Sequence, residues 1–205
     1  TKATEESGHP RWLPITSGIV RDQVVGIVGY GLIGREIHLR LVGFKPRTVY
    51  YVNTIQYSPE VESHIGASYC SIEELFEHCD IIFMQLPYSE KTEQLINRFH
   101  FNRSKPGLIL VNCGRAAVID KNDLFKAIKK RQVGFYAADV FWQEPMPLLD
   151  RYRWSSRTFI SPHMAESIVS DTDYHRRLWM DRLIEELPRL AQRMYPEMRS
   201  ESYPR

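Results

Sequence analysis

Six short apolar runs recur along the middle of the chain, each followed by a longer polar or mixed stretch. Most of them are continuous β-branched or aromatic stretches rather than alternations of apolar and polar residues. Such runs are typical of strands that are buried on both faces of a parallel sheet. The predicted strands cover residues 24–28, 48–52, 81–86, 108–111, 133–138 and 158–160.

Helical spacing occurs between several of these runs. Ser71 and Glu74 have the spacing of a capping box at the start of a helix. Two further segments have apolar residues at the spacing of one helix face. In the first these are Ile33, Ile37 and Leu41, and in the second they are Leu124, Ala127 and Ile128. Because strands and helices alternate, we predict an α/β fold with a doubly wound, mostly parallel sheet.

The composition is that of an ordinary globular domain and excludes several classes of protein. The 205 residues are 43% hydrophobic, and 27 Lys and Arg against 25 Asp and Glu leave a net charge of +2. We therefore expect no nucleic-acid partner, and no apolar stretch is long enough to predict a membrane-spanning helix. Cys70, Cys79 and Cys113 have unrelated spacings, which indicate neither a disulfide framework nor a metal site. This cysteine usage favours a reducing, cytoplasmic location.

A glycine motif, Gly29-Tyr-Gly31-Leu-Ile-Gly34, joins the first predicted strand to the first predicted helix. In a dinucleotide-binding turn the first glycine permits the tight turn and the second lets the backbone approach a pyrophosphate. The third lets helix and strand pack closely. The backbone N–H groups of Leu32 and Ile33 would point at the phosphates from the helix N-terminus. The motif therefore predicts a dinucleotide site.

The second half of that fingerprint departs from the usual pattern. An acidic residue is expected about 20 residues further on, where it holds the ribose hydroxyls. Asn53 is the nearest polar residue here, and it is uncharged. No carboxylate repels a 2′-phosphate, and no Arg follows to attract one. The sequence leaves NAD and NADP open as cofactors, with NAD slightly preferred.

Three polar residues follow three of the predicted strands. Arg115, Glu144 and His163 come after the runs at 108–111, 133–138 and 158–160. The carboxyl ends of parallel strands form one edge, where ligands bind in such sheets. A His can donate a proton to a carbonyl oxygen, a carboxylate favours the imidazolium, and an Arg binds carboxylates. Each residue alone has a plain structural explanation, but the three together favour an active site.

Five segments together carry a family resemblance. They are VGIVGYGLIGRE (25–36), LPYSEKTEQLIN (86–97), KPGLILVNCGRAAVID (105–120), GFYAADVFWQEP (134–145) and SPHMA (161–165). In this order they resemble the NAD-binding domain of the D-isomer-specific 2-hydroxyacid dehydrogenases. The resemblance implies a Rossmann domain that works with a second, substrate-binding domain, which is largely absent from this chain.

The resemblance also implies roles for residues near the expected site. Arg115 would bind the carboxylate and carbonyl oxygen of the substrate. His163 would be the general acid/base, with Glu144 as its partner. Asp139 and the backbone at Cys113 would face the nicotinamide amide.

Two further positions match the family, and one departs from it. Pro87 and Thr92 match the loop beside the cofactor. Ala116 stands where the family usually has Gly, and an Ala would be strained there if the backbone needed a positive φ. No metal site is expected.

The domain organisation follows from the motifs and the resemblance. We expect a dinucleotide-binding domain over residues 23–165, preceded by an N-terminal extension or interdomain segment at 1–22. A C-terminal crossover helix at 166–192 and a polar tail at 193–205 would follow. The chain begins with Thr1 rather than Met, which suggests a processed start or a piece of a longer protein.

The predicted function is NAD(P)-dependent hydride transfer between nicotinamide and a small 2-hydroxy or 2-oxo acid. Related formate dehydrogenases have a Gln where this chain has Glu144, so the resemblance makes formate the less favoured substrate. The alternative function is an NAD(H)-sensing, dimerising, corepressor-like binding protein without significant turnover. A third possibility is that the isolated chain binds cofactor weakly and is inactive as a fragment. We also expect a homodimer.

Overall fold

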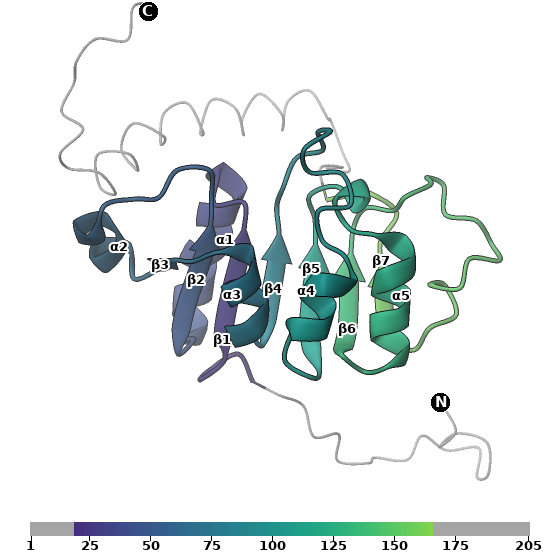
Figure 1. Cartoon of the computed structure of the whole chain (residues 1–205), viewed down its shortest axis with the longest axis horizontal. Coiled ribbons are helices and arrows are strands. Elements are labelled where there is room, and N and C mark those ends of the chain that lie inside the picture. The colour runs from purple at the N-terminus through teal and green to yellow at the C-terminus, as the bar shows by residue number, and fades with distance from the viewer. Residues whose placement is uncertain (1–18, 166–205) are drawn as a thin grey trace, which may run out of the picture.

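The six apolar runs fold as strands of one parallel sheet, together with a short seventh strand. The computed structural model describes residues 19–165, and its sheet has the order β3-β2-β1-β4-β5-β6-β7 with every neighbouring pair parallel (Figure 1). The strands are β1 (Val24–Val28), β2 (Thr48–Val52), β3 (Ser68–Tyr69), β4 (Ile81–Met84), β5 (Leu108–Asn112), β6 (Val133–Ala138) and β7 (Thr158–Ile160). The predicted doubly wound fold is therefore confirmed.

One strand is shorter than predicted. The run at 81–86 forms a strand only as far as Met84. Gln85 and Leu86 belong to the loop before Pro87, which has no N–H to pair with a neighbouring strand.

Helices cover both faces of this sheet. They are α1 (Leu32–Leu41), α2 (Pro59–Ile65), α3 (Ile72–His78), α4 (Arg98–Arg103) and α5 (Lys121–Lys129), with 3₁₀ turns η1 (Val42–Phe44) and η2 (Ala116–Val118). Figure 1 shows α3, α4 and α5 in front of the sheet and α1 behind it. The front helices pack into one hydrophobic cluster and α1 into a second. Leu124, Ala127 and Ile128 are buried on α5, as predicted.

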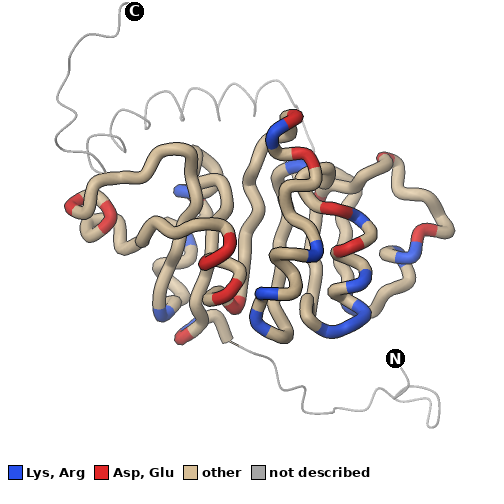
Figure 2. Tube along the Cα trace, viewed as in Figure 1, with Lys and Arg blue, Asp and Glu red and all other residues tan. Residues whose placement is uncertain are grey.

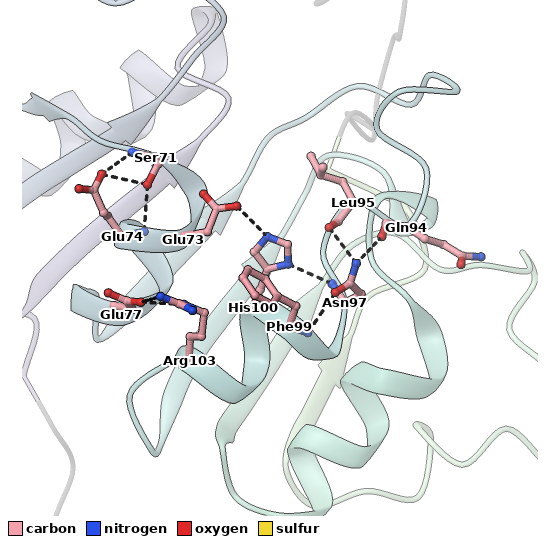
Figure 3. Close-up of polar contacts among 10 residues, drawn as sticks. All are labelled: Ser71, Glu73, Glu74, Glu77, Gln94, Leu95, Asn97, Phe99, His100 and Arg103. Carbon is pink, nitrogen blue, oxygen red and sulfur yellow. Dashed lines mark hydrogen bonds and ion pairs between the residues drawn. The ribbon is translucent and has the colours of Figure 1, made fainter.

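The front helices are held by caps and by an ion pair (Figure 3). Ser71 and Glu74 form the predicted capping box of α3, with Glu74 N–H donating to Ser71 Oγ over 3.2 Å. Arg103 on α4 donates from Nε to Glu77 on α3 over 2.7 Å. Figure 2 shows acidic positions on α3 and basic positions on the neighbouring α4. These contacts fix α4 against α3 even though α4 is short.

The apolar row predicted for α1 is confirmed at Leu41, which is buried, and at Ile37, which is partly buried against the same cluster, but not at Ile33. Ile33 was expected to face the sheet but is 63% exposed. The buried positions are Gly34, His38 and Leu41. The reason is that α1 approaches β1 so closely at Gly34 that a Cβ there would collide with the Gly29 carbonyl oxygen. The glycine must face inward, which turns Ile33 outward.

Several predictions fall outside the described range. The crossover helix at 166–192 and the tail at 193–205 lie outside the described residues, as does most of the segment 1–22. Within residues 19–165 no helix is both long and apolar enough to cross a membrane. The same range contains no group of three or more His, Cys, Asp or Glu residues that could hold a metal ion.

Candidate active site

The glycine motif forms the turn between β1 and α1, at the point where the sheet order reverses direction. Gly29 has a φ of +94°, and a Cβ there would lie 2.8 Å from the carbonyl oxygen of Gln85. A Cβ on Gly31 would meet nothing within 4 Å. Gly29 and Gly34 are therefore required by packing inside the domain, whereas Gly31 opens onto free space. That is the arrangement that a pyrophosphate needs at a switch point between strands.

The N-terminus of α1 faces the same space. Gly31 is the N-cap residue and supplies no side-chain hydrogen bond to the first turn. Leu32 and Ile33, the first two residues of α1, are exposed. Uncapped N–H groups at a helix N-terminus bind anions well. The turn therefore fits the diphosphate of a dinucleotide.

Asn53 follows β2 directly and is half-buried at the predicted ribose position. The loop after it is anchored by Tyr51, which the sequence analysis did not single out. The Tyr51 hydroxyl accepts a hydrogen bond from the Tyr57 N–H and donates one to Glu62 Oε1, both over 2.9 Å. The loop after Asn53 is thus tied to α2 through a buried aromatic residue.

The loop after β4 is closed on itself by Thr92. Its hydroxyl donates to the carbonyl oxygen of Pro87 and accepts from the N–H of Ser89, each over 2.8 Å. The loop leaves the sheet next to the glycine turn, because Gln85 N–H donates to the carbonyl oxygen of Val28 over 2.8 Å. Pro87 and Thr92 therefore lie in a closed loop beside the expected cofactor site.

Arg115 is presented by a turn that begins at the end of β5. Asn112 is fully buried, its Oδ1 accepts from Gly114 N–H over 3.0 Å, and its Nδ2 donates to the Arg115 carbonyl oxygen over 3.3 Å. The Arg115 side chain itself is exposed. Ala116 begins the right-handed turn η2, so the departure from Gly at this position causes no backbone strain. An Asn two residues before a Gly is a known turn signal, which was available in the sequence.

His163 and Glu144 form the central contact of the site. His163 Nδ1 lies 2.7 Å from Glu144 Oε2, and Glu144 Oε1 accepts from the Phe141 N–H over 2.8 Å. The hydrogen bond and charge of Glu144 raise the pKa of His163, whereas the charge of Arg115 acts in the opposite direction. Burial opposes ionisation of Glu144, but the hydrogen bonds from His163 and Phe141 outweigh it and lower its pKa. Arg115, Glu144 and His163 are thus brought to one place.

Asp139 lies at the start of the same loop as Glu144 and is nearly buried. Its Oδ1 accepts from Ser161 Oγ and Met164 N–H, and its Oδ2 accepts from Ala165 N–H. Burial works against ionisation, but these hydrogen bonds and the charge of His163 lower the pKa of Asp139. Ser161 was not identified from sequence, because its partner is 22 residues away.

Cys113 lies between β5 and Arg115. Partial burial and the charge of Asp139 raise the pKa of its thiol. A thiol with a raised pKa is a poor nucleophile at neutral pH, so the side chain borders the site rather than reacting in it.

All the predicted site residues lie at one edge of the sheet. The glycine turn follows β1, Asn53 follows β2, and Pro87 follows β4. Arg115, Asp139 and His163 follow β5, β6 and β7, which are neighbours in the sheet. The second group contains the contact between His163 and Glu144 and the charge of Arg115 that acts on it.

Comparisons with known proteins agree with this geometry. Residues 3–165 match the family model for "D-isomer specific 2-hydroxyacid dehydrogenase, NAD binding domain". The chain is 32% identical over 166 residues to the glyoxylate reductase of Thermococcus litoralis. The aligned region covers 81% of this chain and 49% of that protein. The chain thus spans about half the length of the curated relatives it matches.

Solved structures agree as well. A formate dehydrogenase from Granulicella superposes with a TM-score of 0.73 at 29% identity, covering 83% of this chain and 46% of the other. The D-mandelate dehydrogenase of Rhodotorula graminis gives 0.72 at 26% identity, with coverages of 83% and 49%.

Proposed function

Since this chain belongs to the D-isomer-specific 2-hydroxyacid dehydrogenase family and comprises its NAD-binding domain, we propose that it interconverts a small 2-oxo acid and a 2-hydroxy acid with NAD(H). The observation that carries the proposal is the 2.7 Å contact between His163 and Glu144, within reach of the Arg115 charge. The nicotinamide ring of the bound cofactor supplies or takes up the hydride. The relatives named above are enzymes by name, and they give no support to the corepressor-like alternative.

The glycine turn and the following helix hold the cofactor in this proposal. Gly31 and the N–H groups of Leu32 and Ile33 would bind the pyrophosphate. Pro87 and Thr92 would border it from the loop after β4. The backbone at Cys113 and the side chain of Asp139 would face the nicotinamide end, because they follow β5 and β6.

His163 is the proposed general acid/base. Its Nδ1 is engaged by Glu144, which leaves Nε2 to face the substrate oxygen. The raised pKa keeps a larger fraction of the ring as imidazolium near neutral pH. In the reducing direction His163 donates its Nε2 proton to the oxygen that was the carbonyl, and in the oxidising direction it takes the proton of the hydroxyl.

Arg115 is the proposed substrate anchor. Its guanidinium is exposed at the same edge of the sheet, and a planar guanidinium binds a carboxylate through paired hydrogen bonds. It also polarises the neighbouring carbonyl oxygen. A substrate with a carboxylate next to the reacting carbon satisfies both interactions, which favours a 2-oxo acid over formate.

Asn53 gives the cofactor preference that we propose. Without a carboxylate at this position the repulsion of a 2′-phosphate is weak, and without a following Arg the attraction is weak as well. NAD is therefore preferred over NADP by a narrow margin.

The assembly and location that we propose are a homodimer in the cytoplasm. Leu39, Val42 and Phe44 on α1 and η1 are exposed apolar residues, and an exposed apolar patch of this kind often marks an interface. The free thiols of Cys70, Cys79 and Cys113 fit a reducing compartment.

Replacing His163 by Gln tests the proposal. NADH binding is followed by fluorescence titration, and turnover is measured with glyoxylate, D-mandelate and formate, the compounds in the names of the relatives. We expect turnover of a 2-oxo or 2-hydroxy acid to fall by about 10²- to 10⁴-fold, with the NADH dissociation constant unchanged. The matched control is His64→Gln at an exposed position of α2. Full turnover in His163→Gln would reject His163 as the general acid/base and with it the proposed mechanism.

A further inference from the structure

Both carboxylate oxygens of Asp139 accept hydrogen bonds from other residues of the chain. Oδ1 accepts from Ser161 Oγ over 2.5 Å and from Met164 N–H over 3.0 Å, and Oδ2 accepts from Ala165 N–H over 2.9 Å. The side chain is nearly buried, with 7% of the residue exposed. A buried carboxylate that accepts three hydrogen bonds from its own chain fixes the segment that donates them.

The three donors bracket His163. Ser161 precedes it by two residues, and Met164 and Ala165 are the next two residues after it. On the strand side, Ser161 N–H also donates to the carbonyl oxygen of Ala138, the residue before Asp139, over 2.9 Å. The turn that carries His163 is therefore attached to the end of β6 on both sides of the histidine.

His163 has a backbone conformation that needs such attachment. Its φ is +50°, in the left-handed region that only about a few per cent of non-glycine residues adopt. A residue keeps such a conformation only where the surrounding contacts determine it. The hydrogen bonds of Asp139 supply those contacts.

The imidazole is held by a second acid from the same loop. Asp139 and Glu144 lie five positions apart after β6, and Glu144 contacts His163 Nδ1. Glu144 fixes the ring, and Asp139 fixes the backbone from which the ring projects. The 2.7 Å contact between His163 and Glu144 requires both.

We propose that Asp139 is a positioning residue for His163: its carboxylate holds the 161–165 turn so that the imidazole meets Glu144. The inference rests on the proposed function for the importance of His163 in turnover, but the placement of the ring is a property of the turn itself. We call the three hydrogen bonds that Asp139 accepts from Ser161, Met164 and Ala165 the clamp. Ser161 supplies the only one of the three that comes from a side chain.

A pure charge effect is the competing explanation, and the chain offers a variant that separates the two. Glu144, Asp139 and Arg115 are the charged groups that act on His163. Asp139→Asn removes a charge and an acceptor at once. Ser161→Ala removes one clamp hydrogen bond and changes no charge, and Ser161→Thr keeps the hydroxyl.

The test is an NMR titration of the His163 imidazole in the full chain, with its signal assigned by its absence in His163→Gln. We expect Ser161→Ala to lower the pKa of His163 by roughly half a unit or more toward its ordinary value, because the contact with Glu144 loosens. Ser161→Thr should keep the wild-type pKa, and Asp139→Asn should lower it further. A wild-type pKa in Ser161→Ala overturns the clamp, whether or not Asp139→Asn shifts it. If Asp139→Asn does not fold, the two Ser161 variants decide the question alone.

Turnover separates this inference from the proposed function. The titration needs no substrate, so a lowered pKa of His163 in Ser161→Ala supports the clamp whether or not the wild type reduces a 2-oxo acid. In an active protein Ser161→Ala should reduce kcat several-fold with an unchanged dissociation constant for NADH. An unchanged kcat together with an unchanged pKa rejects the clamp and leaves the proposed function intact.

Discussion

His163 Nδ1 lies 2.7 Å from Glu144 Oε2, across a separation of 19 residues in the chain. The pKa of His163 is raised and that of Glu144 is lowered by this contact. The stabilisation of the folded state by the protonated His163 is present at low pH and is lost as the pH rises through the raised pKa of His163. The stabilisation from Glu144 is present at high pH and is lost as the pH falls through its lowered pKa. The ion pair is therefore intact only between those two values.

The pH dependence of reduction should follow this pair. The rate of 2-oxo acid reduction, as kcat/KM, should fall as the pH rises through the pKa of His163, since the imidazolium is the proton donor. Glu144→Gln should move that fall to lower pH, because the partner that raises the pKa is lost. The measurement is a pH–rate profile, with Glu60→Gln on α2 as a control that keeps the wild-type profile. A Glu144→Gln profile that coincides with the wild type contradicts the assignment of Glu144.

Two alanine substitutions in the glycine motif should have different effects. Gly31→Ala should change the free energy of unfolding by less than about 1 kcal/mol, because its Cβ meets nothing within 4 Å, yet weaken NADH binding at least about tenfold. Gly34→Ala should destabilise by about 1–3 kcal/mol, because its Cβ meets the Gly29 carbonyl oxygen. Denaturation and NADH titration measure both, with Gly43→Ala as the control in open space. Wild-type NADH affinity in Gly31→Ala would show that no pyrophosphate binds there.

Asn53 should control discrimination between the two cofactors. Asn53→Asp restores the acid expected at the ribose, so NADPH binding should weaken by about tenfold or more through charge repulsion, while NADH binding stays equal or improves. Fluorescence titrations with both nucleotides give the ratio. Asn102→Asp, at an exposed position of α4, adds the same charge elsewhere and should leave the ratio unchanged. Equal effects on both nucleotides in Asn53→Asp would place the ribose away from this residue.

The buried Asn112 should matter both for stability and for substrate binding. Asn112→Ala removes one of the two acceptors of the Gly114 N–H, the other being the Met84 carbonyl oxygen, and it removes the Nδ2 donor to the Arg115 carbonyl oxygen. Each lost hydrogen bond should cost about 0.5–1.5 kcal/mol in the free energy of unfolding. The turn that presents Arg115 then loosens, so the KM for the 2-oxo acid should rise while the NADH dissociation constant changes little. Urea denaturation and steady-state kinetics measure the two effects. An unchanged KM would mean that the turn holds Arg115 without Asn112.

Most of the fold could be predicted from local pattern. The six runs are strands because continuous apolar residues of this length are stable only when both sheet faces are covered. Elements with weak local signals, such as β3 and α4, were not predicted. α4 has only six residues, and it is placed against α3 by the contact of Phe101 with Phe76 and by the pairing of Arg103 with Glu77. The prediction for Ile33 was wrong because the close approach of the backbone at Gly34, rather than side-chain hydrophobicity, sets the rotation of α1 at its start.

By itself, the sequence determined the parallel sheet, the glycine turn and the edge at which Arg115, Glu144 and His163 meet. These follow from periodicity and from the rule that parallel strands share their carboxyl ends. Tertiary structure alone decided that Asp139 binds the turn around His163 and that Tyr51 anchors the loop after Asn53. The physical reason is that burial pattern is a property of short segments, whereas a hydrogen bond depends on where its distant partner is placed by the whole sheet.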